Sequence, residues 1–160
     1  MKKEPQHPGV YIQPPIFGIV IFLISAILYN VLPIELINLD TIPMQLIGWS
    51  FMILAFFVGG LGIRIFWIGK TTVETFKSAS SLQTTGIYSL TRNPMYIGLL
   101  AGYLAFAILL GNWWTIISTP IFFAILHFYV IPREEHYLSY RFGKEYITYT
   151  NQVKRWFGKR

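Results

Sequence analysis

Two charged clusters stand at the borders of apolar stretches in this chain, and they hold the residues best suited to chemistry. Arg92, Asn93 and Pro94 directly precede one apolar run, and Glu134 and Glu135 follow the end of the next one. A charged side chain at membrane depth costs roughly 2.5–3.5 kcal/mol, so charges kept at such borders usually serve a function. If both borders lie on the same side of a membrane, the two clusters can form one polar site.

Each cluster also has a purely structural interpretation. Asn93 and Pro94 are common at the start of a helix, as N-cap and first helical residue, and Arg92 could anchor the chain at a membrane interface. Glu134 and Glu135 could simply interact with the positive end of a helix dipole. The residues alone therefore leave a polar site and ordinary helix ends as open alternatives.

The composition indicates an integral membrane protein. Of the 160 residues, 54% are hydrophobic and 12% are charged, whereas soluble domains carry about 25% charged residues. A chain of this length has room for a single membrane domain, which we expect to comprise residues 1–160. The net charge of +6 favours an anionic membrane surface over nucleic acid as the partner of so apolar a chain.

Metal chemistry and thiol chemistry find little support in the sequence. The chain has no cysteine, and its three histidines, His7, His127 and His136, are scattered. No group of histidine and acidic residues has the spacing of metal ligands. We therefore expect no metal site, no disulfide and no cysteine nucleophile.

Four apolar runs approach or reach the length that a helix needs to cross a bilayer, which is about 20 residues. They cover residues 16–32, 46–69, 95–110 and 113–131. The first run could be read as a signal peptide, but no small-residue cleavage site follows it, so we interpret it as a span. In the second run, Gly59, Gly60 and Gly62 would let another helix approach closely.

The basic residues all fall on one side of this four-span arrangement. The 13 lysines and arginines lie before the first run, between the second and third runs or at their edges, and after the fourth run. The connection between the first and second runs contains Glu35 and Asp40 but no basic residue. The positive-inside rule then places both termini in the cytoplasm.

The C-terminal segment is typical of an amphipathic helix that rests on the membrane surface. Gly143 could interrupt it. The predicted fold class is therefore all-α, with about four transmembrane helices and a C-terminal interfacial helix. The apolar residues that recur at helical spacing in this segment are Leu138, Phe142, Tyr146, Tyr149, Val153, Trp156 and Phe157.

Two motifs resemble those of a known family. The first is Gly86-x-Tyr88-x-x-x-Arg92-Asn93-Pro94-x-Tyr96-x-Gly98, and the second is Glu134-Glu135-x-x-Leu138-x-x-x-Phe142-Gly143-x-x-Tyr146-x-x-Tyr149. Together they are similar to the isoprenylcysteine carboxyl methyltransferase family and the related phospholipid methyltransferases. The resemblance covers roughly residues 70–157 and is closest to the short prokaryotic members, which implies a prokaryotic inner or cell membrane.

The resemblance implies an enzyme that uses S-adenosylmethionine, bound by residues about 70–96 and 132–157. It implies catalytic roles for Arg92, near the transfer site, and for Glu134. The cofactor-binding residues implied in this way are Ser80, Ser81, Leu82, Gln83, Tyr88, Asn93, Pro94, Met95, Tyr96, Glu134 and Glu135.

The chemistry of these residue types agrees with that cofactor. S-adenosylmethionine carries a sulfonium, an ammonium, a carboxylate and an adenine, so its site needs a carboxylate, basic or amide donors and aromatic faces. Cations over aromatic rings gain roughly 0.5–2 kcal/mol. Methyl transfer is a direct displacement, for which a protein mainly positions donor and acceptor. Many family members have histidine at the position of Asn93, and an amide cannot titrate near neutral pH.

Two other functions remain open from the sequence. Membrane reductases of unsaturated lipids, which use NAD(P)H, share a similar Arg-Asn-Pro-x-Tyr segment, and a non-catalytic membrane scaffold would suit the glycine and aromatic content. The acceptor is expected to be a lipophilic small molecule or a membrane lipid. The sequence does not name the methylated atom, whether carboxylate oxygen, thiol sulfur or amine nitrogen, nor the oligomeric state.

Overall fold

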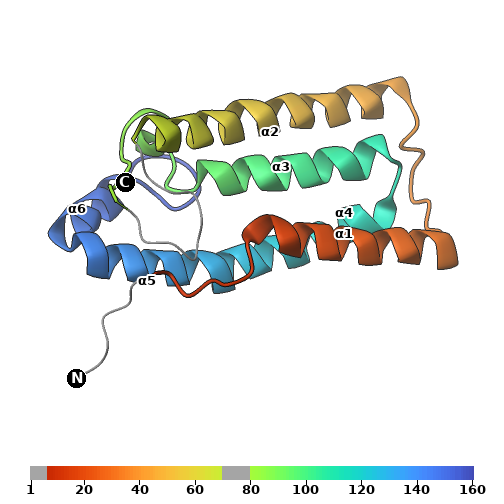
Figure 1. Cartoon of the computed structure of the whole chain (residues 1–160). Helices are drawn as coiled ribbons and strands as arrows, with labels where there is room; N and C mark the ends of the chain where they lie inside the picture. The colour runs from red at the N-terminus through yellow and green to blue at the C-terminus, as the bar shows by residue number, and fades with distance from the viewer. Residues whose placement is uncertain (1–6, 70–79) are drawn as a thin grey trace.

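The computed structural model describes residues 7–69 and 80–160. It is a bundle of apolar helices that run alternately in opposite directions along one axis (Figure 1). The helices of the bundle are α1 (Pro14–Val31), α2 (Ile42–Ile68), α3 (Pro94–Leu109) and α4 (Trp113–Ala124). The prediction of an all-α membrane protein is confirmed.

Three helical segments of the described chain are long and apolar enough to cross a membrane, and α3 is a shorter apolar helix. The three are Pro14–Val31, Ile42–Ile65 and Trp113–Phe142. The predicted spans 16–32 and 46–69 match α1 and α2 closely, and 95–110 matches α3.

The fourth predicted span, residues 113–131, is part of a longer helix. After α4 the chain passes through a π-helical stretch, η2 (Ile125–Val130), directly into α5 (Ile131–Phe142). Pro132 does not end the helix, and it stands in the turn that directly follows this π-helical stretch. The apolar composition ends at Ile131 while the helix continues, since hydrophobicity reports the surroundings of a helix and not its length.

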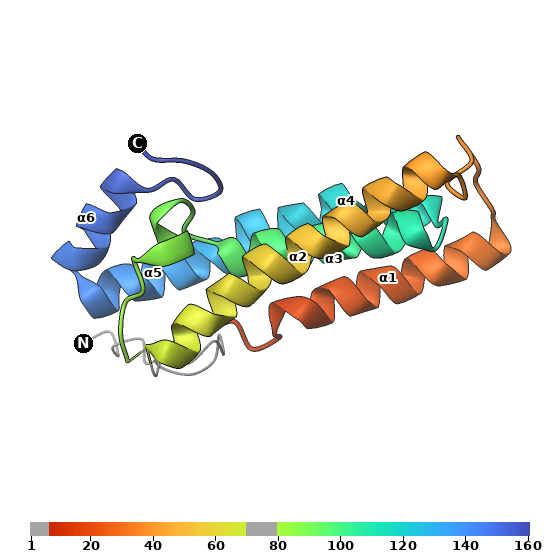
Figure 2. The same ribbon diagram turned by 90° about the horizontal axis from the view of Figure 1, so that it is seen from above.

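Glycines set the close crossing of α2 and α3, which Figure 2 shows from above. A Cβ atom on Gly98 would lie 2.7 Å from the Cα atom of Gly59 and 2.9 Å from the carbonyl oxygen of Ala55. At Gly62, a Cβ atom would meet the side chain of Met95 at 2.9 Å. The close approach predicted at Gly59 and Gly62 is therefore confirmed, whereas Gly60 faces open space.

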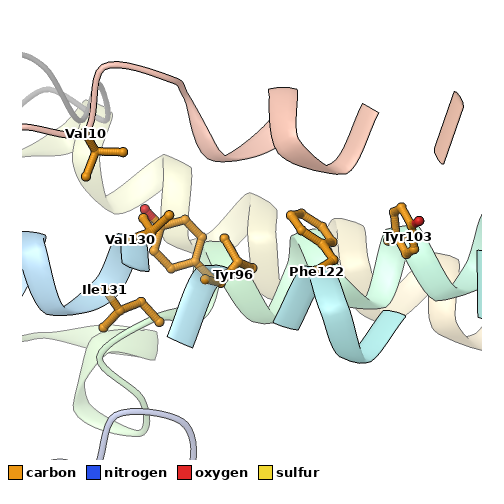
Figure 3. Close-up of a cluster of buried hydrophobic side chains, with 7 residues drawn as sticks. Val10, Tyr96, Tyr103, Phe122, Val130 and Ile131 are labelled. Atoms are coloured by element: carbon orange, nitrogen blue, oxygen red, sulfur yellow. The ribbon is translucent and has the colours of Figure 1, made fainter. Parts of the chain in front are cut away.

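A buried polar network joins the other helices of the bundle. The hydroxyls of Ser25 in α1 and Ser118 in α4 lie 3.0 Å apart, and the Tyr103 hydroxyl of α3 lies 2.8 Å from Ser118 Oγ. From Tyr103 of this network a hydrophobic core extends along the bundle toward α5 (Figure 3). The buried members of that core are Val10, Tyr96, Tyr103, Phe122, Leu126, Val130 and Ile131.

The C-terminal segment differs in detail from the predicted single helix. Gly143, with a φ of 51° that favours glycine, separates α5 from α6 (Lys144–Gln152). Beyond Gln152 the chain turns back, and Val153 pairs with Lys159 in an isolated β-bridge. The helical spacing predicted to include Trp156 therefore ends earlier, because hydrogen bonds to other parts of the chain replace the helical ones.

Both charged clusters lie at the same end of the bundle. Figure 1 places the end of α2, the start of α3, α5 and α6 together at one end. The opposite end carries the connections from α1 to α2 and from α3 to α4. The arrangement that the sequence required for a joint polar site is thus present.

Candidate active site

Arg92 is the central charged side chain of this end. It lies between a 3-10 turn, η1 (Gly86–Ser89), and the start of α3, and its side chain is only 9% exposed. Its Nη2 forms a 3.1 Å ion pair with Oε1 of Glu135, and its Nη1 donates to the Tyr146 hydroxyl at 3.3 Å. Its buried Nε has no hydrogen-bond partner among the described residues, and a buried donor of this kind is costly unless something binds it.

The neighbouring residue Glu134 has a different hydrogen-bond partner from Glu135. The hydroxyl of Tyr96, in the first turn of α3, donates to Oε1 of Glu134, in the first turn of α5, over 2.5 Å. No described residue donates a hydrogen bond to the other carboxylate oxygen. The Tyr96–Glu134 pair therefore joins the two helices and leaves one carboxylate oxygen available.

Both oxygens of Glu135 are engaged by arginines. Besides its ion pair with Arg92, Glu135 accepts from Nη2 of Arg155 at 2.5 Å and from Nε of Arg155 at 3.1 Å. This is a bidentate arginine–carboxylate pair, the strongest common form of charge-assisted hydrogen bond in proteins. Glu135 thus connects Arg92 to the C-terminal turn.

Tyrosines form one wall of the site. Tyr88, Tyr146 and Tyr149 are buried in a cluster with Val153, and the Tyr149 hydroxyl donates to the carbonyl oxygen of Tyr88 at 2.7 Å. Burial raises the pKa of Tyr88, Tyr146 and Tyr149 above the ordinary value of 10.0. Their hydroxyls therefore stay neutral, which suits aromatic faces that bind a cation.

The C-terminal turn is fastened to the segment that carries Arg92. The backbone N–H of Arg92 donates to the carbonyl of Lys154 at 3.2 Å, and that of Gly158 donates to the carbonyl of Leu90 at 2.8 Å. The carbonyl of Arg155 accepts from the Asn93 side-chain amide at 2.9 Å. Asn93 therefore organises the backbone here, and its side chain makes no hydrogen bond to Glu134.

The segment Ser80–Gln83, which the resemblance assigns to the cofactor, lies beside this wall. Leu82 packs against the tyrosine cluster. The Ser81 hydroxyl donates to the carbonyl of Gly69 at 3.2 Å, the Gln83 amide donates to Ser81 Oγ at 2.8 Å, and Ser80 is exposed. The remainder of the predicted cofactor region, residues 70–79, lies outside the described residues.

An apolar groove leads from the side of the bundle to the polar site. Its volume is about 800 Å³, and it lies between α1, α2 and α3. Met95 and Tyr96 line its end at the site, so the Tyr96 ring borders the groove while its hydroxyl binds Glu134. Other residues lining the groove are Gln13, Ile19, Met52, Phe56, Leu99 and Phe106.

The sequence did not predict Arg155 as a site residue, nor the contact of Tyr146 with Arg92. In the sequence, Tyr146 is one of the apolar positions at helical spacing and a member of the second motif. Arg155 is one of several basic residues near the C-terminus, so nothing in its surroundings distinguished it. A basic residue in a turn acquires such a role only through folding of the turn against another segment.

The comparisons with known proteins identify the family. The sequence model of the phospholipid methyltransferase family matches residues 44–145. The chain belongs to this family. It is also 40% identical over 62 residues to an uncharacterized protein of Haemophilus influenzae, a match that covers 39% of this chain and 98% of that protein.

A plant enzyme is a more distant relative. The chain is 34% identical over 74 residues to protein-S-isoprenylcysteine O-methyltransferase B of Arabidopsis thaliana, covering 45% of this chain and 36% of that enzyme. No significant match to a solved structure was found. The resemblance to the isoprenylcysteine and phospholipid methyltransferases is thus confirmed, and membership of this family supports a membrane-embedded methyltransferase.

Proposed function

We propose that this protein transfers a methyl group from S-adenosylmethionine to a lipophilic acceptor in the membrane. The observation that carries the proposal is the meeting of three features at one end of the bundle. These are the buried, unpartnered Nε of Arg92, the half-satisfied carboxylate of Glu134, and the end of an apolar groove at Tyr96. A polar site joined to an apolar groove suits a reaction between a charged cofactor and a lipid.

The residues present fit this cofactor. The available oxygen of Glu134 would bind the ammonium group, and the aromatic rings of Tyr88 and Tyr96 suit the sulfonium. Leu82, Pro94 and Met95 would add apolar contacts, with Ser80, Ser81, Gln83 and Asn93 as the polar residues of the same surface. When bound, S-adenosylmethionine supplies an electrophilic methyl group on its sulfonium.

The protein's own contribution is mainly positioning. Tyr96 fixes Glu134 by its hydrogen bond, and Tyr88, Tyr146 and Tyr149 form a buried cluster at the site. Arg92, whose buried Nε has no hydrogen-bond partner among the described residues, would orient an acidic group of the acceptor or stabilise negative charge. Such positioning accounts for much of the rate in displacement reactions, because a correctly oriented pair avoids the entropy of encounter.

The groove supports a lipophilic acceptor that arrives from the bilayer. It is lined by apolar residues of α1, α2 and α3, and hydrocarbon tails occupy sites of this kind. We infer that the acceptor's polar end stops near Tyr96 while its tail lies along α3. Carboxylate, thiol and amine acceptors are all compatible with this arrangement.

The asymmetry of basic residues supports a topology with the site in the cytoplasm. Both termini would then lie in the cytoplasm, and the membrane would be the inner or cell membrane of a prokaryote. The cofactor would reach the site from water and the acceptor from lipid.

Calorimetric titration of the detergent-purified protein with S-adenosylhomocysteine, and separately with NADPH, tests the proposal. We expect saturable binding of S-adenosylhomocysteine and none of NADPH. Binding of NADPH alone would favour the reductase that the sequence left open. Binding of neither ligand by folded protein would point to a non-catalytic role.

A further inference from the structure

Glu135 is bound by two arginines from different parts of the chain. Arg92 precedes α3, Arg155 follows α6, and each donates to the carboxylate from one side. Arg155 uses two donors and Arg92 uses one, so the Arg155 contact is the more directional of the two. The exposed fractions of the side chains rise from 9% for Arg92 through 20% for Glu135 to 27% for Arg155.

Arg155 is itself held in place by several contacts. Its Nη1 donates to the carbonyl of His127 at 3.4 Å, and its own carbonyl accepts from Asn93 Nδ2 and from Thr91 Oγ1. The neighbouring Trp156 donates from its indole N–H to Nδ1 of His127 at 2.9 Å. Arg155, which binds Glu135, is therefore held by hydrogen bonds both to η2 and to the segment that carries Arg92.

We infer that Arg155 positions Arg92 through Glu135, an inference that rests on the proposed function for its catalytic consequence. Glu135 contacts Nη2 of Arg92 and Tyr146 contacts Nη1, and these two contacts determine the direction in which the unpartnered Nε points. Without Arg155, the Glu135 carboxylate can rotate toward Arg92 alone or toward solvent. The orientation of Nε is then lost although the charge of Arg92 remains.

Charge supports the same role. One carboxylate shared by two guanidiniums leaves one positive charge of the trio unneutralised. That charge remains available to an anionic group that binds the unpartnered Nε of Arg92. Arg155 therefore holds Glu135 in place and at the same time prevents it from fully neutralising Arg92.

This role is not covered by the family comparison. The family match ends at residue 145, before Arg155. The Glu135 carboxylate, which the resemblance grouped with the cofactor residues, is here a link between two arginines. Arg155 and Glu135 are accordingly positioning residues, and Arg92 is the residue that reaches the reacting groups.

The direct test is the side-chain Nε–H resonance of Arg92 in nitrogen-15 NMR spectra of the full-length protein in detergent, assigned by its loss in Arg92→Ala. We expect Arg155→Gln and Arg155→Lys to shift and broaden this resonance, because lysine keeps the charge but cannot bind both carboxylate oxygens. Arg141→Gln is the matched control, since Arg141 is an exposed arginine of α5. An unchanged Arg92 resonance in a folded Arg155→Gln protein would overturn the inference.

Cofactor affinity and turnover separate positioning from general damage. We expect Arg155→Gln and Arg155→Lys to bind S-adenosylhomocysteine like the wild type while methyl transfer falls by up to about a hundredfold, as for a misplaced catalytic group. N-acetyl-S-farnesylcysteine and dioleoylphosphatidylethanolamine vesicles serve as acceptor probes. Adding Arg155→Gln to Arg92→Ala should cause little further loss, because both changes remove one linked function.

The outcomes distinguish this inference from the proposed function. If wild-type protein binds no S-adenosylhomocysteine, or methylates neither probe, the proposed function or its acceptor class is in question while the Arg92 resonance still decides the linkage. Equal loss of cofactor affinity and turnover in Arg155→Lys would overturn the positioning role. Full additivity with Arg92→Ala would do so as well.

Discussion

At the scale of single residues, the adjacent glutamates Glu134 and Glu135 have different partners and different roles. The structure pairs Arg92 with Glu135, and it joins Glu134 to Tyr96. Adjacent glutamates in a helix point about 100° apart, so two neighbours can serve two different partners. The Glu135 carboxylate is thus engaged by arginines, whereas the Glu134 carboxylate has one oxygen that can bind a ligand.

Replacement of Glu134 tests this division. Glu134→Gln removes the charge but keeps the size, so we expect cofactor binding to weaken by about 1.5–3 kcal/mol, the value of a hydrogen bond to a charged group. This corresponds to a roughly ten- to hundredfold rise in the dissociation constant for S-adenosylhomocysteine, measured by calorimetry. Glu145→Gln, an exposed change in α6, is the control. Wild-type affinity in a folded Glu134→Gln protein would remove Glu134 from the cofactor site.

The buried tyrosines predict a pH dependence at the alkaline end. Burial raises the pKa of Tyr88, Tyr146 and Tyr149 above 10.0. Above pH 10 the unfolded chain releases these protons while the folded protein retains them, so the free energy of unfolding should fall as the pH rises; below pH 10 these groups contribute no slope. Ultraviolet titration of the folded protein should show part of the tyrosine absorbance change only at a pH well above 10, and completion of the whole change near pH 10 would contradict the buried wall.

At the scale of elements, the α2–α3 crossing decides whether the site forms. The first turn of α3 carries Tyr96, and α3 is held against α2 by the contact of Gly98 with Gly59. Because the atoms opposite Gly98 belong to the backbone, they cannot move aside as a flexible side chain would. The packing of α2 against α3 therefore fixes the position along the bundle at which Tyr96 contacts Glu134.

A substitution at this crossing should destabilise the bundle. We expect Gly98→Leu to lower the free energy of unfolding by about 1–3 kcal/mol or more, as overpacking does, and to separate Tyr96 from Glu134. Thermal unfolding in detergent provides the measurement. Gly60→Ala is the comparison in α2, where a Cβ meets no atom within 4 Å and stability should change by no more than about 1 kcal/mol. Equal effects of the two changes would argue against the tight crossing.

At the scale of the whole molecule, the alternating helices bring all the candidate site residues to one end (Figure 1). The acidic loop with Glu35 and Asp40 lies at the other end. The proposed function requires the site end to face the compartment that holds the cofactor. The orientation of the bundle in the membrane is therefore as important for function as the geometry of the site.

The absence of cysteine allows a direct test of this orientation. Single cysteines at the exposed positions Glu35 and Gln152 can be labelled with a membrane-impermeant maleimide in intact cells. We expect Glu35→Cys to react from outside and Gln152→Cys to react only after permeabilisation, because basic segments stay in the cytoplasm. The reverse pattern would place the site outside the cell and remove its access to the cofactor. Labelling of both in intact cells would indicate that the bundle does not span the membrane in this way.

The sequence by itself determined the helical bundle, its membrane character and the two motifs. Apolar runs, glycine positions and the borders at Arg92 and Glu134 suffice for this, because hydrophobic burial and helix ends depend on local composition. It did not determine the continuation of the fourth helix into α5, because a continuous helix can pass from lipid into a polar region without a local signal.

Only the tertiary structure decided which charges meet. Helix rotation determines that Arg92 pairs with Glu135 and that Glu134 pairs with Tyr96. The turn after Gln152 brings Arg155 back to Glu135. These depend on the packing of segments far apart in the chain, such as the contact of Gly59 with Gly98. A one-residue choice between neighbouring glutamates has no local signature, because both have the same chemistry and only their direction differs.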